Sequence, residues 1–217
     1  FPTRRSSDLM MNHDIFQEST MTPQLLTHAA LERALILRDL SDPRQGPHAM
    51  QQIIKAIYEA LASRWHCQRY LHRASPILSV AENYDRLGYP PDGAARDARY
   101  TRYVTATHLL RTMTSAMVPS LLRGISLDPP DDLLLICPGL VYRRDTIDRL
   151  HTGEPHQLDL WRIKQGRLTS GDLHEMIQSV VEAALPGCRY RVILASHPYT
   201  IDGVQIDVEV RGDRKSV

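Results

Sequence analysis

The sequence predicts an α+β fold in which separate helices flank an antiparallel sheet. Apolar stripes of helical period occur in distinct segments, strands follow one another without a helix between them, and a long polar loop joins two strands. With 217 residues, of which 42% are hydrophobic and 24% charged, the chain is long enough to bury a core. We therefore expect a single sheet-based core rather than a parallel βαβ arrangement.

The N-terminal part is predicted to contain two helices. The first covers 22–40, where apolar residues recur at helical spacing until Asp42-Pro43 interrupts them. The second covers 49–61 and has a cleaner i, i+3, i+4, i+7 stripe, which predicts that one face packs on the core. We therefore predict an N-terminal helical segment at 10–45 and a core domain at 46–211.

The middle of the chain is less regular. Tyr89 to Gly93 contains Pro90 and Pro91, which predicts a surface loop. A third helix, with a weaker apolar pattern, is predicted over 105–122.

Two strands joined by a long loop are predicted next. An apolar run over 133–136 ends at Pro138-Gly139, and an alternating strand follows over 140–144. A second alternating strand covers 156–163, and the polar loop 146–155 lies between them. This order predicts that the strand at 156–163 returns antiparallel to the one before the loop.

The last predicted elements are a helix and two strands. The helix stripe runs from Leu173 to Leu185, with Ser170 and Asp172 as capping candidates and Pro186-Gly187 as the stop. Strands are predicted over 190–194 and 204–210.

Composition excludes several functional classes. The 26 basic and 25 acidic residues give a formal net charge of +1, which provides no broad basic field for indiscriminate nucleic-acid binding. No apolar run reaches the roughly eighteen residues of a membrane span. Cys67, Cys137 and Cys188 form no C-x-x-C pair, and the histidines do not cluster as metal ligands. We expect a cytoplasmic protein without disulfides or a protein-bound metal site.

Both ends of the chain have the character of a translated sequencing adapter. In one frame GACGCTCTTCCGATCT encodes Arg5 to Leu9, and its reverse complement encodes Asp213 to Val217. We therefore predict that 1–9 and 212–217 are adapter-derived and not native. A genuine basic tail is the alternative. Because adapter at the far end marks the stop of a sequencing read, we expect the natural sequence to continue beyond Arg211.

Polar residues gather on the two strands around the long loop. Period-two geometry puts Arg143 and Asp145 on one face of their strand, and Gln157 and Asp159 on one face of theirs. A guanidinium suits a phosphate, while carboxylates and an amide accept hydrogen bonds from amines. The alternative is a half-solvated sheet face with charged cross-strand pairs.

Four blocks resemble class II aminoacyl-tRNA synthetases, in the form of the phenylalanyl-tRNA synthetase α-subunit. Residues 138–159 resemble the second signature motif of this class, and three further blocks follow the α-subunit pattern in the same order, at 83–97, 109–115 and 197–208. The resemblance implies a class II core, an antiparallel sheet flanked by helices, that is incomplete at its C-terminal side because the third signature motif is missing.

The resemblance also implies an activity and an ATP site. Enzymes of this family are ligases that activate an amino acid with ATP and Mg²⁺ to an aminoacyl-adenylate and transfer the aminoacyl group to tRNA. By position, Arg143 holds the α-phosphate and acts in catalysis, Asp145 reads the adenine amino group, and His151 lies near the outer phosphates. Without the third motif, we expect the fragment alone to be weak or inactive.

The family's amino-acid site maps onto a second set of positions. These are Ser115, Gln157 and Asp159 for the ammonium group, and His197 and Tyr199 for the side-chain pocket. This sequence departs from the family at three of its positions, because Met113 replaces a histidine, and His197 and Tyr199 replace two phenylalanines. We therefore expect a pocket that suits a more polar side chain than phenylalanine.

The acceptor and the partners stay open at this point. The resemblance implies tRNA, and either a homodimer or a β-type partner subunit. A stand-alone paralogue that ligates the amino acid to a protein or small molecule is the alternative, favoured by the short region before Asp42 and by the altered pocket. A non-catalytic amino-acid-sensing module is the third possibility, and the presence of Arg143 and Asp145 argues against it.

Overall fold

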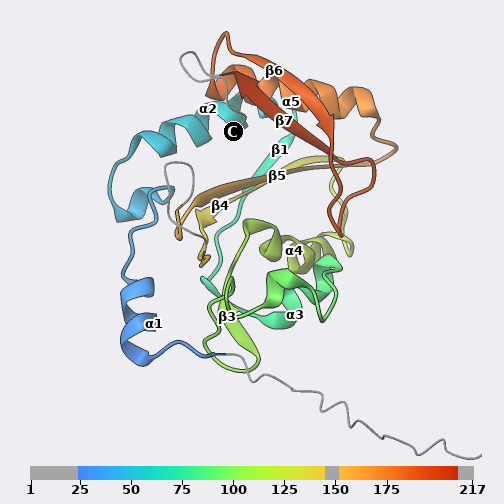
Figure 1. Cartoon of the computed structure of the whole chain (residues 1–217). Coiled ribbons are helices and arrows are strands. Elements are labelled where there is room, and N and C mark those ends of the chain that lie inside the picture. The colour runs from blue at the N-terminus through green and yellow to red at the C-terminus, as the bar shows by residue number, and fades with distance from the viewer. Residues whose placement is uncertain (1–23, 145–151, 210–217) are drawn as a thin grey trace, which may run out of the picture.

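The computed structural model describes residues 24–144 and 152–209, and it has the predicted α+β architecture (Figure 1). The adapter-like ends at 1–9 and 212–217 lie outside the described residues, as do Asp145 and His151. The helices are α1 (His28–Leu35), α2 (Ala49–Trp65), α3 (Val80–Asn83), α4 (Val118–Ile125) and α5 (Ser170–Ala184). The strands are β1 (Gln68–Leu71), β2 (Ile77–Ser79), β3 (His108–Leu110), β4 (Asp132–Leu140), β5 (His156–Lys164), β6 (Arg189–Leu194) and β7 (Val204–Glu209).

The central sheet has the order β1-β4-β5. Its main pair, β4 and β5, is antiparallel, with Asp132 opposite Lys164 at one end and Leu140 opposite His156 at the other. The pairs β2–β3 and β6–β7 are antiparallel too. Only β1, which the sequence pattern did not reveal, runs parallel to β4. A parallel neighbour is possible here because a long connection containing two short helices and β2–β3 separates β1 from β4.

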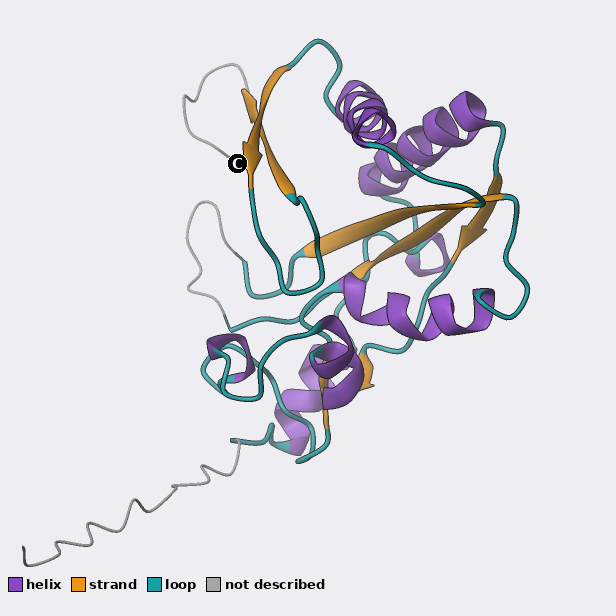
Figure 2. Ribbon diagram, turned by 90° about the vertical axis from the view of Figure 1, so that its right-hand side faces the viewer, coloured by secondary structure: helices purple, strands orange, loops and turns teal. Residues whose placement is uncertain are grey.

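Helices cover both faces of this sheet (Figure 2). On one face, Leu134 and Ile136 of β4 pack with Ile57 and Leu61 of α2 and with side chains of α5. On the other face, Leu135 and Cys137 pack against the turn Thr114–Met117 and the start of α4. Because β4 is buried on both sides, its sequence is an apolar run rather than an alternating one.

The helix predictions are partly confirmed. The helix predicted over 49–61 is α2, and α5 begins with a capping box between Thr169 and Asp172, so that Ser170 is the first helical residue and not the cap. The helix predicted over 22–40 is shorter, because Thr27 caps α1 and the chain leaves the helix at Ile36. The helix predicted over 105–122 is wrong: this stretch contains β3, a 3₁₀ turn and the start of α4.

Two physical reasons account for that error. His108–Leu110 pairs with β2, a long-range interaction that outweighs a weak local helix pattern. Pro119 lies in the first turn of α4, where a missing backbone N–H is tolerated, so the helix begins only there.

β4 continues through Pro138-Gly139, where a break between two strands was predicted. The last residue of β1, Leu71, pairs with Ile136, so Pro138 lies beyond the end of β1. Proline has no backbone N–H, but no neighbouring strand needs a donor at this point, so β4 continues through Pro138. Pairing with the returning chain even continues past Leu140, because Arg143 N donates to Gly153 O at 2.7 Å.

Arg111 fills the space beside this edge. Its side chain is buried; Nε donates to Leu140 O at 2.8 Å and Nη1 donates to Ala74 O at 3.1 Å. Burial lowers the pKa of this guanidinium, while the Asp39 carboxylate opposes that shift. Gly139 lies directly under the guanidinium. The close approach is possible because glycine has no side chain.

Gly139→Ala is expected to lower the free energy of unfolding by about 1–3 kcal/mol, the usual cost of overpacking. A Cβ at this position would overlap Arg111 Nη2 and lie 2.9 Å from Cζ, and Arg111 cannot move aside without losing its bonds to Leu140 and Ala74. Urea unfolding measures the change. Gly124→Ala in α4 is the control, because no atom lies within 4 Å of its added Cβ and stability should be unchanged or higher. Equal stability of the two variants would contradict a fixed Arg111.

Candidate functional site

Three of the predicted site residues meet on one face of β5. Asp159 and Gln157 are two residues apart and both face the turn Thr114–Met117. Thr114 Oγ1 donates to Asp159 Oδ2 at 2.5 Å, and Ser115 Oγ lies 3.1 Å from each carboxylate oxygen. Thr114 N donates to Gln157 Oε1 at 3.1 Å. The structure thus brings Ser115, Gln157 and Asp159 together, with Thr114 as a further member that the sequence reasoning missed.

The Asp159 carboxyl is partly buried and lies among neutral hydrogen-bond donors. Burial raises the pKa of this carboxyl, and hydrogen bonds from the side chains of Thr114, Ser115 and Trp161 oppose the rise. In the part of the chain that the structure describes, no arginine, lysine or histidine forms an ion pair with it. A partly buried carboxylate whose described donors are all neutral is electrostatically incomplete. The arrangement therefore suits a cation with several N–H donors, which could bind the carboxylate and the Gln157 carbonyl together.

Arg143 lies on the chain just beyond β4 and contacts the residues that precede the same turn. Its Nε donates to Thr112 O at 3.0 Å, and its own carbonyl accepts from Arg102 Nη2 at 2.8 Å. Arg102 is held by an ion pair with Glu154. These contacts fix the direction of the Arg143 guanidinium, a group that can bind a phosphate through two parallel hydrogen bonds.

The segment 112–115 connects the two halves of the site. Thr112 binds Arg143 through its carbonyl, and Thr114 and Ser115 bind Asp159. Asn83 anchors the segment: its Nδ2 donates to Thr112 Oγ1 at 2.9 Å, and its Oδ1 accepts from Thr112 N at 3.1 Å. Asn83 is completely buried. Its place in the first of the four sequence blocks was the available signal for this anchoring role.

His197 and Tyr199 reach the site through Tyr89. The Tyr199 ring centre lies 6.2 Å from that of Tyr89 and 5.7 Å from that of His197. The approach is close because Gly88 has φ +72° and an added Cβ would lie 3.2 Å from Pro198 O.

Tyr89 is more than the surface loop residue that its prolines suggested. Its ring also contacts Tyr84 edge to face at 5.5 Å, and it belongs to the same apolar cluster as Met113, the neighbour of Thr114. Burial raises the pKa of the Tyr89 hydroxyl, as do Tyr199 and Tyr84, while Arg143 opposes the shift. Tyr89 therefore lies between the aromatic loop residues and the arginine side of the site.

Two of the predicted ATP residues, Asp145 and His151, are outside the described residues. Among the described residues, no group of three or more histidine, cysteine, aspartate or glutamate side chains is placed to hold a metal ion. Within the same ranges, none of the helices has both the length and the apolar character required to cross a bilayer.

Comparison with known proteins gives a consistent result. The family model for the class II core domain (F) of tRNA synthetases matches residues 39–217. The phenylalanine–tRNA ligase α-subunit of Limosilactobacillus reuteri is 32% identical over 166 residues, which are 75% of this chain and 45% of that protein. The α-subunit of Nostoc punctiforme is 33% identical over 130 residues, which are 60% of this chain and 38% of that protein. The chain thus spans less than half the length of these relatives.

A solved structure shares the fold. The pyrrolysyl-tRNA synthetase of Desulfitobacterium hafniense superposes with a TM-score of 0.56 at 18% identity, over 76% of this chain and 56% of that one. At this identity the likeness concerns the fold only.

Asp159→Asn is expected to raise the free energy of unfolding by about 1 kcal/mol at neutral pH, since it removes a partly buried charge that no cation in the described residues compensates. The folded-state pKa of Asp159 is raised above the ordinary 3.8. Ionisation of Asp159 therefore destabilises the fold as the pH rises above 3.8. The advantage of the amide should therefore shrink as pH falls toward 3.8. Thermal unfolding as a function of pH measures this dependence.

Asp42→Asn is the matched control, because Arg44 lowers the pKa of Asp42 and its ionised form stabilises the fold. This control should lose stability at neutral pH. A loss of the same sign for Asp159→Asn would mean that a cation already pairs with Asp159.

Proposed function

The chain belongs to the family of class II tRNA synthetase core domains, and from this premise we propose that its protein activates an amino acid with ATP and transfers the aminoacyl group to tRNA. The observation that supports the proposal is the Asp159 carboxylate beside Gln157 on β5, which no cation among the described residues compensates, next to the segment 112–115 that also binds Arg143. An α-ammonium group supplies the missing positive charge and N–H donors for both acceptors. The amino acid's own carboxylate then extends toward the arginine side.

The chemistry of activation matches these groups. A carboxylate oxygen of the amino acid forms a bond to the α-phosphorus of ATP, and the bond from that phosphorus to the β-bridging oxygen breaks, so pyrophosphate leaves. Negative charge builds on the α-phosphate oxygens, where the Arg143 guanidinium stabilises it. The attacking carboxylate is already ionised, so no side chain has to remove a proton. We assign catalysis to positioning and charge neutralisation by this chain's residues.

ATP and Mg²⁺ are the proposed cofactors. When bound with ATP, Mg²⁺ supplies charge neutralisation on the phosphates. Because the described residues contain no metal cluster, we assign no metal ligand to this part of the chain. Asp145 is proposed to bind the adenine amino group, and His151 to approach the outer phosphates.

The side-chain pocket is proposed to accept a more polar amino acid than phenylalanine. Tyr199, His197 and Tyr89 place two hydroxyl groups and an imidazole on one aromatic cluster. A pocket with such groups favours a substrate that can satisfy them and discriminates against one that leaves them without a partner. Met113 packs on the same apolar core as Tyr89, and its thioether accepts hydrogen bonds only weakly.

The altered pocket also favours a second candidate function, in which a paralogous ligase passes the amino acid to a protein or small molecule. Charging assays with total tRNA separate the two acceptors. A cytoplasmic location, and either a homodimer or a β-type partner subunit, are further parts of the proposal. A non-catalytic amino-acid-sensing module is the third candidate, and the ATP measurements below test it.

Amino-acid-dependent exchange of pyrophosphate into ATP by the full-length protein tests the activity itself. Arg143→Ala should lower kcat/KM in this exchange by at least about a hundredfold, because it removes the positive charge at the α-phosphate. Arg99→Ala, at an exposed surface ion pair with Asp97, is the control and should leave the rate unchanged. Absence of exchange with every amino acid would remove the enzyme proposal, and unchanged ATP affinity in Arg143→Ala would favour the sensing module.

The double variant His197→Phe with Tyr199→Phe should shift the preference toward phenylalanine by about tenfold in relative kcat/KM, since it removes polar groups that an apolar side chain leaves unpaired. Exchange assays over a panel of amino acids measure the preference. Tyr103→Phe serves as the control: its hydroxyl donates to Arg96 O at 2.6 Å and takes no part in the pocket. An unaltered preference in the double variant would place the pocket elsewhere.

A further inference from the structure

The outer edge of β4 loses its strand neighbour before β4 ends. β1 pairs with β4 only as far as Ile136, whose carbonyl still accepts from His72 N at 2.8 Å. Leu140, four residues further along β4, directs its N–H and C=O to side chains instead. Asp39 Oδ2 accepts from Leu140 N at 3.3 Å, and Arg111 Nε donates to Leu140 O at 2.8 Å. A carboxylate and a guanidinium thus replace the missing strand.

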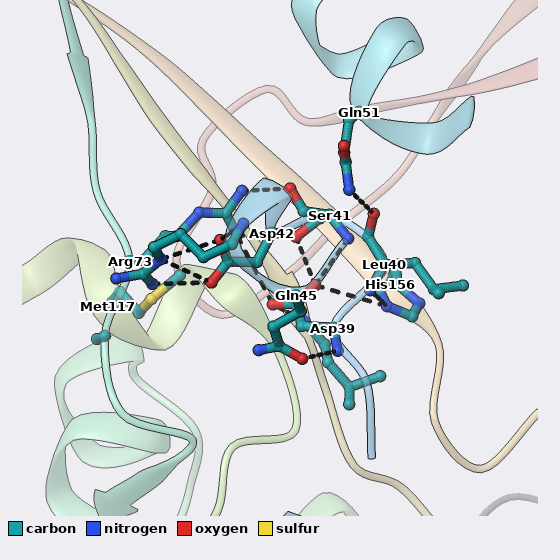
Figure 3. A network of polar contacts seen from close by, with 12 residues as sticks. Asp39, Leu40, Ser41, Asp42, Gln45, Gln51, Arg73, Met117 and His156 are labelled. Carbon is teal, nitrogen blue, oxygen red and sulfur yellow. Dashed lines mark hydrogen bonds and ion pairs between the residues drawn. The ribbon is translucent and has the colours of Figure 1, made fainter. Parts of the chain in front are cut away.

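Ser41 and Arg73 hold the Asp39 carboxylate in place (Figure 3). Ser41 donates to Oδ1 through its backbone N at 2.9 Å and through Oγ at 2.6 Å. Arg73 Nη1 lies 3.6 Å from Oδ2 and donates to Ser41 Oγ at 2.9 Å. Because Arg73 is the second residue after β1, the carboxylate is linked to the strand that ends early as well as to β4.

The same segment also binds the partner strand. Leu40 N donates to His156 Nε2 at 2.9 Å, and this ring nitrogen lies 3.6 Å from Asp39 Oδ1 (Figure 3). Burial lowers the pKa of His156, although Asp39 opposes the shift, so the neutral ring accepts the Leu40 bond. Leu140 and His156 are the last register pair of β4 and β5. Residues 39–41 therefore bind both strands at the end of the hairpin where the connecting loop begins.

This end of the hairpin carries the proposed site. Arg143 follows Leu140 by three residues, and Gln157 directly follows His156. We infer that Asp39 is a positioning residue, which fixes the end of the β4–β5 hairpin and thereby the placement of Arg143 relative to Gln157 and Asp159. The inference rests on the proposed function. The inference gives residues 39–41 an indirect part in ATP binding. Their hydrogen bonds to the hairpin go to the backbone of Leu140 and to His156.

Asp39→Asn is the variant that tests this inference, because it keeps the size of the side chain and turns one acceptor oxygen into a donor. We expect it to weaken binding of ATP with Mg²⁺ by about tenfold, since small displacements of positioning groups have effects of this order. Asp42→Asn is the matched control: Asp42 is a buried carboxylate in the same segment, but its hydrogen bonds go to Arg44. It should lose thermal stability and keep ATP affinity within about twofold.

A second measurement separates positioning from general damage. Hydrogen exchange at the Leu140 amide should become faster in Asp39→Asn and stay unchanged in Asp42→Asn. If Asp39→Asn does not fold, Ser41→Ala removes one bond to the carboxylate and should weaken ATP binding in the same direction by about threefold.

The results of these measurements distinguish failure of the inference from failure of the proposed function. Unchanged ATP affinity in both the Asp39 and Ser41 variants, or an equal loss in Asp39→Asn and Asp42→Asn, overturns the inference and leaves the proposed function intact. Unchanged exchange at Leu140 overturns it as well. These measurements use the full-length protein. No ATP binding by the unsubstituted full-length protein at millimolar ATP overturns the proposed function, and this inference with it.

Discussion

The backbone N–H and C=O of Leu140 lie on the edge of β4 beyond the end of β1, where no neighbouring strand pairs with them. Several parts of the structure supply hydrogen-bond partners to these two groups. An unpaired buried N–H or C=O costs about 1–3 kcal/mol. Arg111 binds the carbonyl, which requires a buried guanidinium, a glycine at position 139 and further carbonyl acceptors such as Ala74 O. Asp39 binds the amide, which requires the N-terminal segment to fold back against the sheet. Hydrogen bonds at this edge therefore connect the N-terminal segment and the segment containing Arg111 to β4.

Near the loop, β5 has apolar side chains on one face and polar side chains on the other. Leu158 and Leu160 join the apolar core under α2 and α5, while Gln157 and Asp159 face the Thr114–Met117 turn. The polar side has a partly buried carboxylate whose pKa is raised and which no cation in the described residues pairs. Such an arrangement lowers stability in the absence of a ligand, and it is typical of a binding site rather than of a structural pair. One strand thus contributes both to the apolar core, through Leu158 and Leu160, and to the candidate site, through Gln157 and Asp159.

Local patterns predicted the regular elements well and the irregular ones poorly. The stripes of α2 and α5 and the alternation of β5 were strong enough to define those elements, because each contributes regularly spaced apolar side chains to the same core. β1 and β2 are short, and the exposed pattern of β1 gives no alternation. The helix predicted over 105–122 failed because pairing of β3 with β2 outweighed its local preference. The site followed the same division: period two indicated that Gln157 and Asp159 share a face, whereas Thr114, Asn83 and Tyr89 were not expected there.

By itself the sequence determined the α+β class, the main antiparallel pair and the family. The hydrophobic period and the spacing of residues within the four motifs are local properties that can be read from the sequence alone. Only the tertiary structure decided which side chains satisfy the edge of β4, that Asp159 is partly buried without a counterion among the described residues, and that Tyr89 lies against Tyr199. These features depend on contacts between segments tens of residues apart. No pattern within one segment specifies such contacts, since packing and the need to pair buried polar groups select them when the chain folds.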